Sequence, residues 1–186
     1  MLHTKPFPGT SRIPFEQLCR DASMMLGLAD TQALGTGQPV VLDGVALELQ
    51  RKGGANQFVL LADMGPAAQD HKAGIYERLF LLQMISWAQP GLRYGFNADR
   101  ATLVMCLEAS CGPGADGEWL ARVIRAAAAE VTRLRSTLLA GDTGPKGDGD
   151  TTHPFQAAAK RFVAIHEASL AAEPALDASP TSSQAA

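Results

Sequence analysis

The sequence predicts an α+β fold in which helices and strands follow one another in the order α-β-β-β-α-β-β-α. Three segments carry apolar residues at helical spacing, and two pairs of β-rich runs each flank a short turn. The chain has 186 residues, 46% of them apolar, which is enough for one domain and an appendage. We therefore expect a two-layer sandwich with a twisted antiparallel sheet, homodimeric and followed by a C-terminal extension.

The first helix is expected between Ile13 and Leu28, where apolar residues recur at helical spacing. Pro14 suits its first turn, because the missing N–H has no partner to lose there. Gly27 and the glycine-containing stretch up to Pro39 end the helix.

Residues 40–49 form two β-rich runs around Asp43 and Gly44, a pair favoured in two-residue hairpin turns because both residues tolerate positive φ. The next strand, at 57–62, is apolar on both alternating sets of side chains. Such a strand meets apolar groups on both faces. One face belongs to the core, and the other needs a partner.

The middle helix is expected at 75–89 and carries apolar side chains around most of its circumference. In a small domain one flank of such a helix covers the sheet, so the other flank indicates a subunit interface. A second hairpin follows, with strands at 92–97 and 101–109.

Asp116 is placed to cap the last helix. Its core-facing stripe consists of Leu120, Val123, Ile124, Ala127, Val131, Leu134 and Leu138.

Composition divides the chain into an arm (1–12), a folded domain (13–139), a flexible linker (140–152), a short amphipathic helix (153–171) and a disordered tail (172–186). Residues 1–139 hold 13 acidic and 13 basic side chains, whereas residues 140–186 hold 6 and 3, so the net charge of −3 comes from the end of the chain. No basic block is present, and we expect neither nucleic-acid nor membrane binding.

No motif for catalysis or metal binding emerges. The four histidines are scattered, and the three cysteines, an odd number, suit reduced structural thiols better than disulfides. The longest apolar run, at 79–85, is too short to span a membrane, and no apolar stretch follows the N-terminus as in a secretion signal. We expect a cytoplasmic non-enzyme with no cofactor and no metal.

Five features follow one another along the chain: Phe15 to Cys19 opening the first helix, the Leu42-Asp43-Gly44 hairpin, the apolar middle helix, the hairpin at 94–106 and the closing helix after Trp119. This order of elements resembles that of the type III secretion effector chaperones of the Tir chaperone (CesT-like) family, class I. The similarity covers roughly residues 12–139. It implies a homodimer in the bacterial cytosol that binds the N-terminal region of a secreted effector in extended form. It also implies that the effector stays soluble and secretion-competent, and that the export apparatus releases it without ATP hydrolysis by the chaperone.

In that family the first helix and the first three strands offer apolar patches to the effector. The resemblance gives as effector-binding candidates Phe15, Leu18, Met25, Val41, Leu47, Leu49, Phe58 and Leu60. About half of them should be ordinary core, because the sequence does not fix which alternating set of each strand faces outward.

The middle helix and the second hairpin resemble the parts with which such chaperones dimerise, in agreement with the apolar circumference of that helix. The dimer-interface candidates are Leu79, Leu82, Trp87, Leu103 and Met105. The C-terminal extension departs from the family. It could cover an apolar patch in the free protein, contact the export ATPase or have no role, and the sequence does not choose among these.

Two other classes of function remain open. The chain could be a small dimeric α/β adaptor or regulatory protein that binds a folded partner. A small-molecule sensor or enzyme would need a polar pocket, whose only sign is Tyr94, Asn97, Asp99 and Arg100 near the second turn. Those residues are explained by the turn itself.

Overall fold

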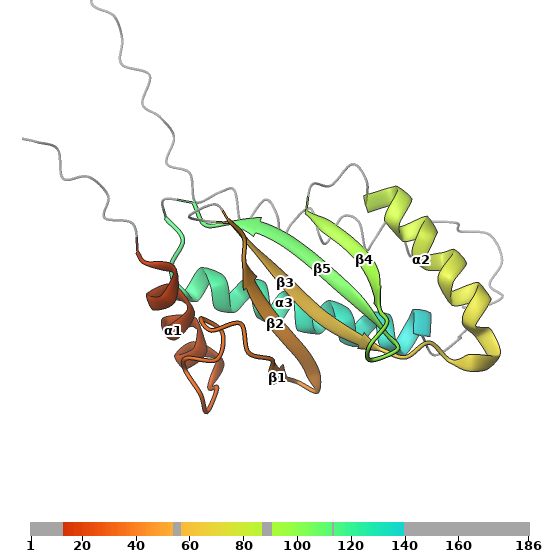
Figure 1. Ribbon diagram of the computed structural model, residues 1–186, viewed down its shortest axis with the longest axis horizontal. Coiled ribbons are helices and arrows are strands. Elements are labelled where there is room, and N and C mark those ends of the chain that lie inside the picture. The colour runs from red at the N-terminus through yellow and green to blue at the C-terminus, as the bar shows by residue number, and fades with distance from the viewer. Residues whose placement is uncertain (1–12, 54–56, 87–90, 113, 140–186) are drawn as a thin grey trace, which may run out of the picture.

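The computed structural model describes residues 13–53, 57–86, 91–112 and 114–139 (Figure 1). The predicted arm, linker, tail helix and disordered end lie outside these residues, as does Trp87. The main elements are α1 (Phe15–Leu26), β1 (Val40–Leu42), β2 (Val45–Arg51), β3 (Gln57–Gly65), α2 (Lys72–Ser86), β4 (Leu92–Asn97), β5 (Thr102–Ser110) and α3 (Gly117–Leu134). A 3-10 turn, η1 (Gln69–His71), precedes α2, and a π-helical turn, η2 (Arg135–Leu139), follows α3. The predicted α+β class and order of elements are confirmed.

The five strands form one antiparallel sheet in the order β1-β2-β3-β5-β4, with β3 at its centre. The predicted hairpin turn is confirmed, since Asp43 and Gly44 have φ values of 50° and 75°. The second hairpin turns through Ala101, whose φ is 53°. β1 and β4 are the edge strands.

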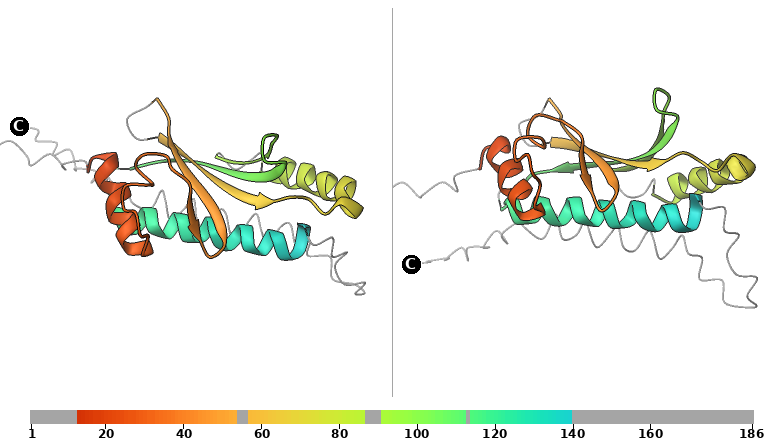
Figure 2. Two further views of the ribbon diagram at one scale, coloured as in Figure 1. Left: turned by 60° about the horizontal axis from the view of Figure 1, so that its bottom comes forward. Right: turned by 90° about the horizontal axis from the view of Figure 1, so that it is seen from below.

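The helices α1 and α3 lie on the same side of the sheet, and α2 lies beyond it, next to β4 (Figure 2). The whole predicted stripe of α3 is buried. It packs on the inward side chains of the central strands, among them Leu47, Leu60, Ala62 and Met105.

Local chemistry explains where these helices begin and end. Pro14 lies just before α1 rather than inside its first turn, and Gly27 ends that helix in the left-handed region with a φ of 70°. Asp116 caps α3, as predicted, and its Oδ1 accepts a hydrogen bond from the Trp119 N–H at 2.8 Å.

Candidate functional site

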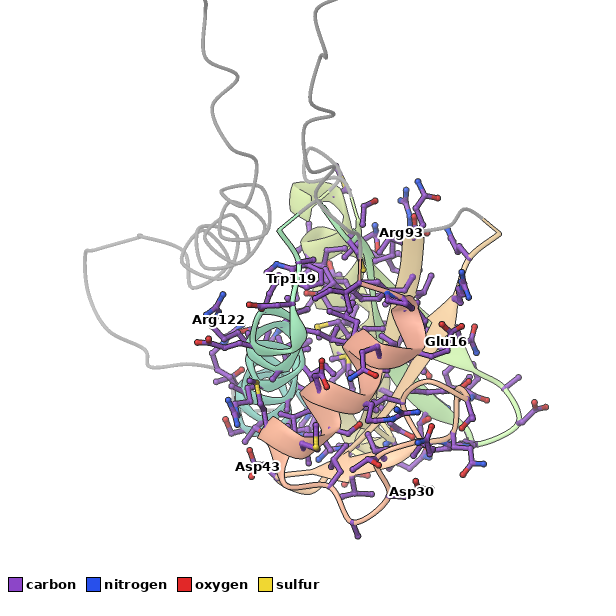
Figure 3. All side chains as sticks on the ribbon, turned by 90° about the vertical axis from the view of Figure 1, so that its left-hand side faces the viewer. Glu16, Asp30, Asp43, Arg93, Trp119 and Arg122 are labelled. Carbon is purple, nitrogen blue, oxygen red and sulfur yellow. The ribbon has the colours of Figure 1, made fainter. Side chains whose placement is uncertain are left out.

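The sheet has one face under α1 and α3 and a second face, here called the open face, over which no described helix lies (Figure 2). The pairing of neighbouring strands places four residues in one row across this face: Glu48, Leu61, Cys106 and Arg93. Figure 3 shows Arg93 and the α3 residue Arg122 on opposite sides of the molecule. From the sequence, both alternating sets of β3 side chains were expected to be apolar, with one set outside the core of the protomer. The open face is where that second set lies.

A groove of about 270 Å³ lies on the open face. Its apolar lining includes Ala46 from β2, Leu61 from β3 and Val104 from β5, all half-buried. When a partner covers half-buried apolar side chains on such a sheet and removes them from water, the free energy falls and binding is favoured.

The lining has a gap at Gly95 of β4, which pairs with Val104 on the neighbouring strand. A Cβ atom placed on Gly95 would meet no atom within 4 Å. The missing side chain therefore leaves space above the sheet at this position.

Charges are unevenly distributed around the groove. Glu48 and Asp63 come from β2 and β3, whereas Arg100 comes from the turn between β4 and β5. Asp63 Oδ1 accepts from the Gly65 N–H at 2.7 Å and its Oδ2 from the Thr102 hydroxyl at 3.3 Å. Within the part of the chain that the structure describes, Arg100 forms no ion pair.

Further along the open face, Lys52 Nζ lies 2.7 Å from Glu108 Oε1. This hydrogen bond from Lys52 is the main reason that the pKa of Glu108 lies below its usual value. The pair is exposed, so it contributes little to stability. Arg93, which lies on the same face, also lowers the pKa of Glu108, by a smaller electrostatic contribution.

The three cysteines form no disulfide with one another. Burial raises the pKa of Cys19 to about 12, with smaller contributions from Cys111 and Glu16. Cys106, which lines the groove, also has a raised pKa, again mainly because of burial. In the described ranges no three His, Cys, Asp or Glu side chains come together as a metal site would require.

Most of the predicted effector-binding residues lie in the core. Met25 and Val41 are exposed, but the other six are buried: Phe15, Leu18, Leu47, Leu49, Phe58 and Leu60. The pleat turns the four strand residues of this set toward the helices, and Phe15 and Leu18 lie on the buried side of α1, so none of the six is a surface residue. The groove residues Ala46, Leu61, Gly95 and Val104 are not among the candidates predicted from the sequence. The signal that β3 needs a second partner was present, but it could not show which set would face outward.

The dimer-interface candidates that the structure describes do not lie on the surface of the protomer. Leu79, Leu82, Leu103 and Met105 are buried within the protomer. On the opposite flank, α2 exposes Phe80 by 73% and Met84 by 74%, together with Leu81. The helix is thus apolar on two sides, as predicted, but its free side is formed by different residues.

None of the described helices is long and apolar enough to cross a membrane. No protein-family model and no curated protein matches the chain. Among solved structures, a chain of the HopA1–SchA chaperone–effector complex matches with a TM-score of 0.52 at 15% identity, covering 66% of this chain and 93% of that one. A chain of the ExsC–ExsE complex matches at 16% identity with a TM-score of 0.48, covering 67% and 92%. The resemblance drawn from the sequence is therefore confirmed at the level of the fold, which this chain shares with a component of the HopA1–SchA complex.

Proposed function

We propose that this protein is a type III secretion chaperone of the bacterial cytosol. It binds the N-terminal region of a secreted effector in extended form and keeps that effector soluble and secretion-competent. The observation that carries the proposal is the grooved open face, where apolar side chains of three strands are left without cover by any described element. The fold shared with a chain of a chaperone–effector complex supports it.

The dimensions of the groove favour an unfolded segment over a folded domain. A hollow of about 270 Å³ accepts a few side chains at a time. An extended chain presents every second side chain to one surface, so successive residues on one of its faces can fill such a hollow. Binding alone accounts for this function, and the proposal includes no catalytic step.

The second part of the proposal is a homodimer formed through α2. Phe80, Leu81 and Met84 project from the flank of α2 that does not face the core. Large apolar side chains gathered on one helix flank are typical of an interface, and a second copy offers the same flank. Because this flank and the groove consist of different residues, dimerisation leaves the groove residues free for the effector.

Co-purification from the native host tests the effector-binding function. A tagged wild-type protein should recover a secreted protein whose N-terminal region resists limited proteolysis. Leu61→Asp, on the open face, should lose this partner, whereas Ile13→Asp, at an exposed apolar residue before α1, should retain it. Recovery of only a folded cytosolic regulator, by the wild type and both variants alike, would contradict the proposal and favour the adaptor.

A further inference from the structure

We propose that the groove selects the segment it binds through two side chains, an apolar one seated over Gly95 and an acidic one paired with Arg100. This inference rests on the proposed function and adds the chemistry of the bound segment to it. The occupant is thus an unfolded peptide segment in which an apolar residue and an aspartate or glutamate lie close together.

The apolar half of the inference follows from the gap at Gly95. Gly95 pairs with Val104 of the neighbouring strand, and a Cβ on Gly95 would touch nothing within 4 Å. A partner side chain seated there would replace the one that the strand lacks and would cover Val104. Removing this apolar surface from water favours binding.

The acidic half follows from the charges around the groove. Arg100 has an exposed side chain and no ion pair among the residues that the structure describes. The two carboxylates of the lining already accept hydrogen bonds, Glu48 from the Gln50 amide and Asp63 from Thr102 and Gly65. Among the residues that line the groove, Arg100 is therefore the charged donor available to a carboxylate on the partner.

The same arrangement fixes the orientation of the segment. Glu48 lies on the β2 side of the groove and repels an acidic residue placed there, whereas the Asp63 carboxylate accepts a hydrogen bond from Thr102 of β5. Arg100 lies on the β4–β5 side. A segment with one apolar and one acidic residue consequently binds with the acidic residue toward the β4–β5 turn.

A library of random 12-residue peptides displayed on phage tests this inference. The full-length wild type should enrich peptides that share an apolar and an acidic residue at a fixed spacing. Arg100→Glu should exchange the acidic residue for lysine or arginine, and Gly95→Val should exchange the apolar residue for a smaller one. Gly53→Val is the matched control, because a Cβ on Gly53 also meets nothing within 4 Å and Gly53 does not line the groove. Thermal unfolding of each variant confirms that it is folded.

The outcomes separate this inference from the proposed function. Enrichment of apolar peptides with no preference for an acidic residue, or with one that Arg100→Glu leaves unchanged, would overturn the inference alone. The function would then still be supported by co-purification of a secreted protein. If the wild type enriches no common pattern and co-purification also recovers no secreted protein, both are overturned.

Discussion

Arg135 is joined to Gly44 by a hydrogen bond of 2.8 Å from its Nη1 to the Gly44 carbonyl, which connects the end of α3 to the β1–β2 turn. The same guanidinium donates from Nη2 to the Asp63 carbonyl at 2.7 Å and from Nε to the Met64 carbonyl at 3.1 Å. The strand register shifts between Asp63 and Gly65, so Arg135 binds the backbone at an irregularity of β3. One side chain thus secures the strand end from which Asp63 reaches the groove.

Replacing Arg135 by alanine should therefore destabilise the domain. Three carbonyls lose a charged donor, and we expect the free energy of unfolding to fall by about 2 to 3 kcal/mol. Arg135→Lys should recover only part of this, because an ammonium group lacks the planar fork that reaches three acceptors. Urea unfolding followed by circular dichroism measures both variants.

Arg122→Ala is the matched control for Arg135. Arg122 lies on the exposed side of α3, where among the described residues its one ion pair is with Glu118, four residues earlier, at 2.9 Å. Its removal should change stability by less than about 0.5 kcal/mol. Equal losses for Arg122→Ala and Arg135→Ala would show that the three carbonyl bonds contribute nothing specific.

The close approach of α1 and α3 depends on Gly117. A Cβ at this position would lie 2.4 Å from the Asp21 Cβ and 2.9 Å from the backbone nitrogen of Ala22. Gly117→Ala should push the two helices apart and destabilise the domain by roughly 1 to 3 kcal/mol. Gly112→Ala, whose Cβ would meet nothing within 4 Å, should leave stability unchanged or raise it slightly. A shift of the urea midpoint for Gly112→Ala as large as for Gly117→Ala would contradict the steric explanation.

The accuracy of the sequence-based predictions depended on whether the deciding chemistry is local. The Asp43-Gly44 turn and the Asp116 cap were predicted correctly because each is determined by residues adjacent in the sequence. Which set of β3 side chains faces the core was not predicted. Leu60 and Leu61 are equally apolar, and only the packing of α3 turns Leu60 inward. The gap at Gly95 has no signal in the sequence, because it depends on the neighbouring strand.

The middle helix shows the same limit. Its apolar circumference correctly indicated apolar residues on two flanks, but Leu79 and Phe80 differ only in the direction in which each projects. Deciding between them requires the position of α2 relative to β4, which the side chain of Gln83 helps to set by accepting a hydrogen bond from the Tyr94 N–H at 2.8 Å.

The two flanks of α2 should respond differently to substitution. Phe80→Asp places a charge on the exposed flank and should convert the proposed dimer to a folded monomer. Leu79→Ala removes buried apolar volume and should instead lower the free energy of unfolding by about 2 to 5 kcal/mol. Sedimentation equilibrium at micromolar concentration measures the first effect and urea unfolding the second. A wild type that sediments as a monomer, or a Phe80→Asp variant that remains dimeric, would contradict an interface on this flank.

The cysteines provide a direct measure of groove occupancy. Thiolates are the species that react with maleimide, so a raised pKa slows labelling at neutral pH and makes the rate increase with pH. Cys106 is half-buried in the groove and has such a pKa, whereas Cys19 is fully buried with a pKa of about 12. We expect mass spectrometry to find Cys106 labelled slowly in the native protein and Cys19 only after unfolding.

Addition of the co-purified effector segment should slow the labelling of Cys106 further while leaving the rate in the Leu61→Asp variant unchanged. Equal labelling of Cys106 with and without the bound segment would place the effector away from the groove.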